Sequence, residues 1–179
     1  AFSPMLRKED GRIINIGSAS GPVFVAECSA QRKKIFNNPA VTWADVEALI
    51  AEVLSAEEKG TLNKLGLGDW EQGSEHIYGF TKALVNCHTA ALAKSSPGLN
   101  VRSITPGYIA TDMTQPWAEE AGQTPQEMGM KKPEDGGQTV VSALLSTEPG
   151  NGWFYGSDGL RSPLDRYRSP GSAPYDGSQ

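Results

Sequence analysis

Short apolar runs recur along the chain and predict three strands. The segments 12–16, 100–104 and 153–155 each hold adjacent apolar residues, several of them β-branched or aromatic, next to glycine, proline or polar positions. Two longer segments between them predict helices. The first runs from Ser74, its expected N-cap, to about residue 94, and the second starts at Pro133 and ends at residue 145. This alternation is typical of parallel strands joined by right-handed crossovers, and it predicts an α/β fold.

A long insertion, residues 22–73, separates the first strand from the helix that begins at Ser74. Thr42 and Asp45 have the spacing of a capping box and predict the start of a helix. Apolar residues follow at the i, i+3, i+4, i+7 and i+8 positions of one helix face: Val46, Leu49, Ile50, Val53 and Leu54. Gly60 ends the pattern. We interpret this helix as packing material, because it carries no residues suited to chemistry.

The two ends of the chain and the segment after the second strand have weaker patterns. Phe2 to Leu6 predicts the last turn of a helix, and residues 116–130 predict a lid-like stretch of weak helical character. From residue 157 to residue 179 the chain is rich in Pro, Gly and Ser, which predicts a polar, solvated tail. We therefore expect one domain over residues 1–156, followed by this tail.

The composition argues against several classes of function. A formal net charge of −5 does not fit a nucleic-acid-binding surface, which is usually basic. No apolar run approaches the ~20 residues of a membrane-spanning helix, and the N-terminus lacks the pattern of a signal peptide. Cys28 and Cys87 are too few for a disulfide framework and have no metal-ligand spacing. We expect two buried thiols, no metal site and an intracellular location, with the cytoplasm favoured over an organelle.

Tyr78 and Lys82 are the first candidates for chemistry. They are four residues apart on a predicted helix and therefore project from one face, about a turn apart. A phenol is a poor acid or base at neutral pH, but a lysine cation a few ångströms away favours its phenolate form. The pair is suited to give a proton to a carbonyl that is being reduced. The spacing taken alone also fits two unrelated surface residues.

Two further segments follow predicted strands at the edge where open α/β sheets bind ligands. Ser18 comes after the first strand, and its hydroxyl could hydrogen-bond a substrate carbonyl or simply close a turn. The segment 106–113 comes after the second strand, and its Pro106 and Gly107 fit either a ligand loop or an ordinary loop. Because the carboxyl ends of parallel strands lie at one edge of a sheet, we expect these segments and Tyr78 to meet there.

In combination, three segments resemble the short-chain dehydrogenase/reductase family. They are residues 11–18 with the family's active-site serine, residues 78–82 with its tyrosine-x-x-x-lysine motif, and residues 100–113 with its proline-glycine cofactor loop. The resemblance spans roughly residues 2–160 and implies the C-terminal part of a Rossmann-like, doubly wound parallel sheet. The insertion and the segment 132–137 are similar to those of the monomeric NADPH-dependent carbonyl reductases, whose inserted helices cover a face that other members use to form tetramers.

The resemblance implies a role for each candidate residue. Tyr78 would donate a proton to the carbonyl oxygen as hydride arrives, Lys82 would assist it and bind the nicotinamide ribose, and Ser18 would steady the carbonyl oxygen. The loop would line the nicotinamide through four residues and face the substrate through two others: Pro106, Gly107, Ile109 and Thr111, then Tyr108 and Met113. The implied reaction reduces a small ketone, aldehyde or quinone to an alcohol, with NADPH as cofactor and NADH as the alternative.

Family members also have an N-terminal half, whose glycine-rich turn binds the pyrophosphate of the cofactor, and this chain contains no such turn. Three strands alone would leave an open sheet edge, so we expect a preceding half or a protein partner to cover it. Two hypotheses follow. The chain is either the catalytic part of a reductase, which the intact Ser18, Tyr78 and Lys82 favour, or a non-catalytic subunit that serves as an interaction module in a larger assembly.

Overall fold

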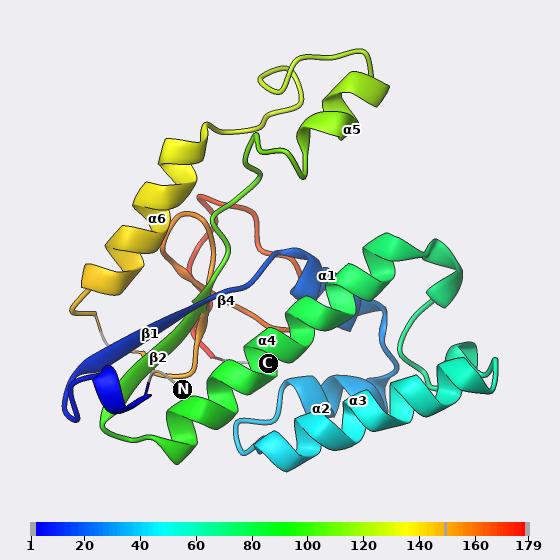
Figure 1. The fold of residues 1–179 in the computed structure, drawn as a ribbon, viewed down its shortest axis with the longest axis horizontal. Helices are drawn as coiled ribbons and strands as arrows, with labels where there is room; N and C mark the ends of the chain where they lie inside the picture. Colours follow the sequence, from blue (N-terminus) through cyan, green and yellow to red (C-terminus); the bar gives the residue numbers. More distant parts are fainter. Residues whose placement is uncertain (1–2, 149, 178–179) are drawn as a thin grey trace.

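The computed structural model describes residues 3–148 and 150–177, and a small sheet lies at its centre (Figure 1). Four strands follow one another across the sheet in the order β1 (Gly11–Ile16), β2 (Leu99–Ile104), β3 (Phe154–Tyr155) and β4 (Arg161–Ser162). The first three run parallel, and β4 is antiparallel to β3. Ile16 pairs with Ile104, so β1 and β2 end at the same edge. The α/β fold and the three parallel strands predicted from the sequence are confirmed.

Helices lie on both sides of these strands. Those in the described ranges are α1 (Ser20–Glu27), α2 (Ala30–Phe36), α3 (Trp43–Glu58), α4 (Ser74–Ser95), α5 (Gln115–Glu120) and α6 (Pro133–Leu145), with short 3-10 helices at Ser3–Met5, Leu62–Lys64 and Trp70–Gln72. Figure 1 shows α6 on one side of the strands, and α4 with the insertion helices on the other. Both α4 and α6 contact β1. This arrangement leaves the carboxyl ends of β1 and β2 between the two layers.

The predicted helices are present, with small differences at their ends. Thr42 and Asp45 form the expected capping box, in which Asp45 N donates to Thr42 Oγ1 (3.2 Å) and Thr42 N donates to Asp45 Oδ2 (2.8 Å). The predicted N-cap at Ser74 is wrong by one residue, because Gly73 takes that position with a φ of 70° and Ser74 is the first helical residue. Such a φ favours glycine, so the conformation of Gly73 sets where α4 begins.

The two ends of the chain differ from the sequence expectation. A 3-10 turn, Ser3–Met5, stands where the sequence predicts the end of an α-helix, and Phe2 lies outside the described residues. The segment predicted to be a solvated tail contains β4, and Tyr175 N donates to the carbonyl oxygen of Arg161 in that strand (3.0 Å). An ion pair between Asp158 and Arg168 also ties this segment together. The segment is therefore folded against the sheet.

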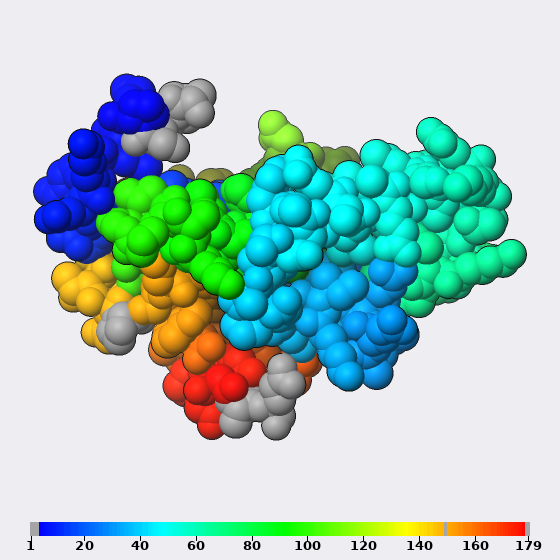
Figure 2. Space-filling model, turned by 90° about the horizontal axis from the view of Figure 1, so that it is seen from below, coloured from blue at the N-terminus to red at the C-terminus, as the bar shows by residue number. Residues whose placement is uncertain are grey.

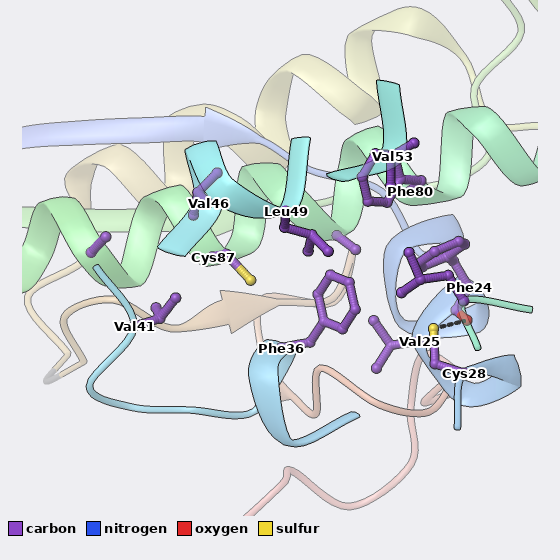
Figure 3. Packing of buried hydrophobic residues seen from close by; sticks show 13 residues of the cluster. Phe24, Val25, Cys28, Phe36, Val41, Val46, Leu49, Val53, Phe80 and Cys87 are labelled. Atoms are coloured by element: carbon purple, nitrogen blue, oxygen red, sulfur yellow. Dashed lines mark hydrogen bonds between the residues drawn. The ribbon is translucent and has the colours of Figure 1, made fainter. Parts of the chain in front are cut away.

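The hydrophobic core lies among the helices (Figure 3), where thirteen buried residues form one cluster. Phe24 of α1 is 2% exposed, and its ring contacts Phe36 of α2 and Phe80 of α4 at centroid distances of 5.9 and 5.5 Å. Val46, Leu49 and Val53 of α3 belong to the same cluster and Ile50 packs against it, so this part of the predicted apolar face is confirmed. The prediction is wrong for Leu54, which is 55% exposed because it lies at the side of the helix turned from the core. Figure 2 shows the resulting layer, in which the insertion (blue to cyan) lies against α4 (green).

Cys28 and Cys87 belong to this core, and burial raises the pKa of each thiol to about 12. Because the thiolate is the reactive form of cysteine, neither is expected to react with dithionitrobenzoate in the folded protein. Both are expected to react once denaturant unfolds it. Following the absorbance of the released thiol product with and without denaturant measures this difference. Rapid modification of either cysteine in the folded protein would contradict the packing seen here.

Candidate active site

Two of the predicted catalytic residues, Tyr78 and Lys82, lie on the first half of α4. Lys82 Nζ is 5.4 Å from the centroid of the Tyr78 ring. It also donates a hydrogen bond to the carbonyl oxygen of Ile16, the last residue of β1 (3.0 Å). Tyr78 is partly open to solvent, with 37% of its surface exposed. The lysine cation is thus next to the phenol ring, and the pair stands at the carboxyl end of β1.

Ser18 lies in the short loop between β1 and α1, two residues after Ile16. Its Oγ accepts a hydrogen bond from Ser20 N and donates one to Ser20 Oγ, both at 3.2 Å. The hydroxyl therefore closes the turn that starts α1, as the simpler of its two sequence interpretations predicts. It can still turn towards a ligand by giving up the bond to Ser20 Oγ. The sequence did not single out Ser20, because its position alone looks like that of any loop residue.

Two glycines let α1 and α4 approach closely enough to bring these residues together. A Cβ at Gly21 of α1 would lie 3.1 Å from the backbone carbonyl carbon of Lys82. A Cβ at Gly79 of α4 would lie 2.9 Å from Phe24 Cβ, closer than two such atoms normally pack. Because α1 begins directly after the loop that holds Ser18, this contact sets that loop beside the first turns of α4.

The predicted cofactor loop leaves the carboxyl end of β2, beside the end of β1. Gly107 has a φ of 102°, which favours glycine, and a Cβ there would lie 3.1 Å from Ser157 Cβ. Ile109 is buried (8% exposed), and its carbonyl oxygen accepts from Thr114 Oγ1 (2.5 Å). Thr111 N donates to the same hydroxyl oxygen (3.0 Å). These bonds give the loop one defined backbone path at the end of β2.

Helix α6 packs against this loop. A Cβ at Gly136 would lie 3.0 Å from Ile109 Cδ1 and 3.5 Å from Pro106 Cβ, so the glycine lets α6 pack directly on the loop. The segment that leads into α6 also pairs with the loop backbone, where Lys131 N donates to the carbonyl oxygen of Tyr108 (2.8 Å). The side chain of Ile109 therefore packs against α6.

Tyr108 and Met113, the predicted substrate residues, lie next to α5. The Tyr108 ring stacks on the Trp117 ring, with centroids 6.1 Å apart and planes at 28°. Met113 is 66% exposed and Trp117 is 46% exposed. The stacked rings and the exposed thioether of Met113 thus come from the loop and from the segment that directly follows it. The sequence did not identify Trp117, because its contact with Tyr108 depends on how the intervening residues fold back.

Two hollows, of about 640 and 350 Å³, lie in the insertion and are lined by none of the predicted site residues. The first is bordered by Glu27 and Asp69, and the second lies between α2 and α3. Across residues 3–148 and 150–177, no group of histidine, cysteine or acidic side chains could hold a metal ion. Within the same ranges, no helix has the length and apolar character needed to cross a membrane. Among the predicted site residues, Tyr78 and Met113 are open to solvent (37% and 66% exposed), whereas Ile109 is buried.

Comparison with known proteins shows similarity to reductases. The chain is 26% identical over 139 residues to carbonyl reductase [NADPH] 1 from Homo sapiens, which covers 72% of this chain and 48% of that protein. It is 24% identical over 157 residues to short-chain dehydrogenase/reductase 1 from Saponaria officinalis, covering 87% and 47% of the two chains. The structure of salutaridine reductase from Papaver somniferum has a TM-score of 0.62 and 22% identity, over 82% of this chain and 45% of that one.

The chain spans about half the length of the curated relatives it matches. No protein-family model matches it. The relatives are nevertheless a carbonyl reductase and a short-chain dehydrogenase/reductase, and the structural neighbour shares the α/β fold over most of this chain. The resemblance predicted from three short motifs is therefore confirmed: the chain is related to the short-chain dehydrogenase/reductases, carbonyl reductases among them, and has their fold over the part that it spans.

Proposed function

We propose that this chain is the part of an oxidoreductase that holds the substrate carbonyl and its proton donor, and that the whole protein uses NADPH to reduce a small ketone, aldehyde or quinone to an alcohol. The observation that carries the proposal is the position of Lys82 Nζ, 5.4 Å from the centroid of the Tyr78 ring, at the carboxyl end of β1. The relative named carbonyl reductase [NADPH] supports the choice of reaction and of cofactor.

The residues at this edge fit the nicotinamide end of such a cofactor. Gly107 follows β2 with a φ that favours glycine, and Ser157 occupies the side where a Cβ would lie, so a flat ring would meet the loop backbone from the other side. The ammonium of Lys82 has three N–H donors and uses one on Ile16 O, which leaves donors for ribose hydroxyls. The rest of the predicted cofactor loop would line the ring. Bound there, the nicotinamide would supply hydride to the carbonyl carbon.

In this proposal Tyr78, Lys82 and Ser18 act together on the carbonyl oxygen. Tyr78 donates its phenolic proton to that oxygen, so the product is a neutral alcohol and the phenolate carries the negative charge. The Lys82 ammonium stabilises this charge. Ser18 Oγ donates a hydrogen bond to the same oxygen and holds it towards Tyr78. Because Tyr78 is partly exposed, a proton from solvent can restore the phenol.

On the substrate side, we propose contact with Tyr108, Trp117 and Met113. Stacked aromatic rings bind flat or apolar groups, and a thioether adapts its shape to irregular ones. This surface therefore favours a carbonyl compound with an apolar or aromatic body over a small, highly polar one.

The open edge of the sheet favours a second candidate, a non-catalytic interaction module. Among the described strands, β1 stands at the end of the sheet and pairs with β2. Such an edge can bind a further strand. An interaction module has no physical need for Lys82 beside Tyr78, however, and we therefore favour the reductase.

Titration of the native, full-length protein with NADPH tests the proposal. We expect a saturable change in fluorescence, and oxidation of NADPH when a quinone or an aromatic aldehyde is added. A parallel titration with NADH compares the two cofactors in the same sample. If a folded protein of full mass binds neither of them, the reductase is rejected and the interaction module remains.

A further inference from the structure

We propose that Asn86 and Thr89 are positioning residues of the proposed reductase. Both fix the rotation of α4 about its axis, and thereby the places of Tyr78 and Lys82 at the edge of the sheet. The inference rests on the proposed function for its effect on turnover, and on the hydrogen bonds of α4 for its geometry.

A stripe of polar side chains runs along the sheet-facing side of α4. Lys82, Asn86 and Thr89 follow one another at spacings of four and three residues, so they lie on one face of the helix. Each makes a hydrogen bond to β1 or β2. Tyr78 stands one turn before Lys82 on the same face. The stripe therefore connects the proposed proton donor to two buried hydrogen bonds between α4 and the strands.

Asn86 bonds the helix to β2 and packs against the residue that follows β1. Ser103 Oγ in β2 donates to Asn86 Oδ1 (2.8 Å), and the two residues are 1% and 3% exposed. A Cβ at Gly17 would lie 3.2 Å from the same Oδ1 atom. The amide therefore packs directly against the residue that precedes Ser18, and any shift of Asn86 changes the space beside that loop.

Thr89 makes a second hydrogen bond between α4 and the sheet, one turn after Asn86. Asn15 Nδ2 in β1 donates to Thr89 Oγ1 (2.8 Å), and Thr89 Oγ1 donates to the carbonyl oxygen of Val85 (2.8 Å). Thr89 is fully buried, at 0% exposed. Asn15 is the partner of Ser103 in the pairing of β1 with β2. The hydrogen bonds of Asn86 and Thr89 thus hold α4 to a pair of residues that lie side by side in β1 and β2.

Apolar packing alone would define this rotation loosely. The other buried face of α4 carries the apolar side chains of Phe80, Ala83, Cys87 and Ala91. It also carries the buried His76, whose Nε2 hydrogen-bonds Leu67 O of the insertion (2.8 Å). The apolar contacts have no preferred direction of their own, and the hydrogen bond of His76 goes to the insertion rather than to the strands. Hydrogen bonds require alignment, and a buried polar group that loses its partner is costly. A roll of α4 would break the bonds of Asn86 and Thr89 together, which holds the helix in one orientation.

The test is the double variant Asn86→Leu with Ser103→Ala in the full-length protein. Because it removes both partners, no polar group of this pair is left buried without a bond, and most of the stability is expected to remain. We expect the turnover number to fall by about 10- to 100-fold, the scale of a misplaced catalytic group, with little change in the KM for NADPH. Thr89→Val is expected to act in the same direction.

Cys87→Ala is the matched control. Cys87 is 2% exposed, lies beside Asn86 on the same helix and belongs to the apolar core, so its truncation lowers the melting temperature without touching the polar stripe. We expect its turnover number to stay near that of the wild type. Equal losses of turnover in the double variant and in Cys87→Ala, at matched melting temperatures, would overturn the positioning role.

Crystal structures of the wild type and the double variant separate this proposal from the proposed function. We expect Lys82 Nζ to leave Ile16 O in the double variant, whether or not the protein reduces carbonyls. An unchanged α4 would overturn the proposal even in an active enzyme. A displaced α4 in a protein whose wild type binds no nicotinamide cofactor would support the positioning and reject the reductase.

Discussion

Replacing Tyr78 by phenylalanine is expected to lower the turnover number by about 100- to 10,000-fold, the range that a positioned acid or base contributes. The change removes only the hydroxyl, which is the group that gives its proton to the carbonyl oxygen in the proposed reaction. The ring remains, and with it the contact with Lys82 at 5.4 Å. NADPH binding is therefore expected to stay nearly intact. Steady-state kinetics with a saturating carbonyl substrate, and a fluorescence titration with NADPH, measure the two effects.

Tyr167→Phe is the matched control for this experiment. Tyr167 is 53% exposed and lies in the C-terminal segment, away from α4 in the sequence and outside the proposed site. Removal of its hydroxyl is expected to change neither turnover nor binding. If the Tyr78→Phe variant kept most of its turnover while it still bound NADPH, another group would have to supply the proton, and the assignment of Tyr78 would be wrong.

The sequence was sufficient to predict the first strands, α3, α4 and α6, but not α1, the helix that begins directly after Ser18. A β-branched run gave β1, the Thr42 and Asp45 capping box gave α3, and Pro133 gave the start of α6. These signals are local, because each depends on residues within one or two turns of each other. The family resemblance also rests on local signals. Ser18 follows a predicted strand, and Tyr78 and Lys82 lie four residues apart on a predicted helix.

Other features depend on contacts between distant segments, and no local pattern reveals them. Gly21 and Gly79 look like ordinary helix-weakening residues until α1 and α4 are seen to meet at those positions. The stacking of Trp117 on Tyr108 could not be predicted, because it depends on the backbone path of the whole segment between them. β4 has two residues in a polar stretch, and its pairing with β3 comes from the return of the chain after a tight turn.

The Phe24→Ala variant is expected to lower the free energy of unfolding by about 3–5 kcal/mol, as is usual for the truncation of a buried aromatic residue. Phe24 is 2% exposed. Its ring contacts rings from α2, from the insertion loop and from α4: Phe36, Trp70, His76 and Phe80. The cavity left by alanine can close only if three helices move together. Denaturant unfolding of the variant and the wild type measures the difference.

Val23→Ala, on the same helix, controls for the loss of a side chain from α1. Val23 is 44% exposed, and its truncation is expected to change the free energy of unfolding by no more than about 0.5 kcal/mol. Because α1 begins directly after Ser18, a loosened α1 also loosens the hydroxyl proposed to hold the carbonyl. Phe24→Ala is therefore expected to raise the KM for the carbonyl substrate even at temperatures where it stays folded. Equal losses of stability in the two variants would mean that the rings around Phe24 are not the centre of this core.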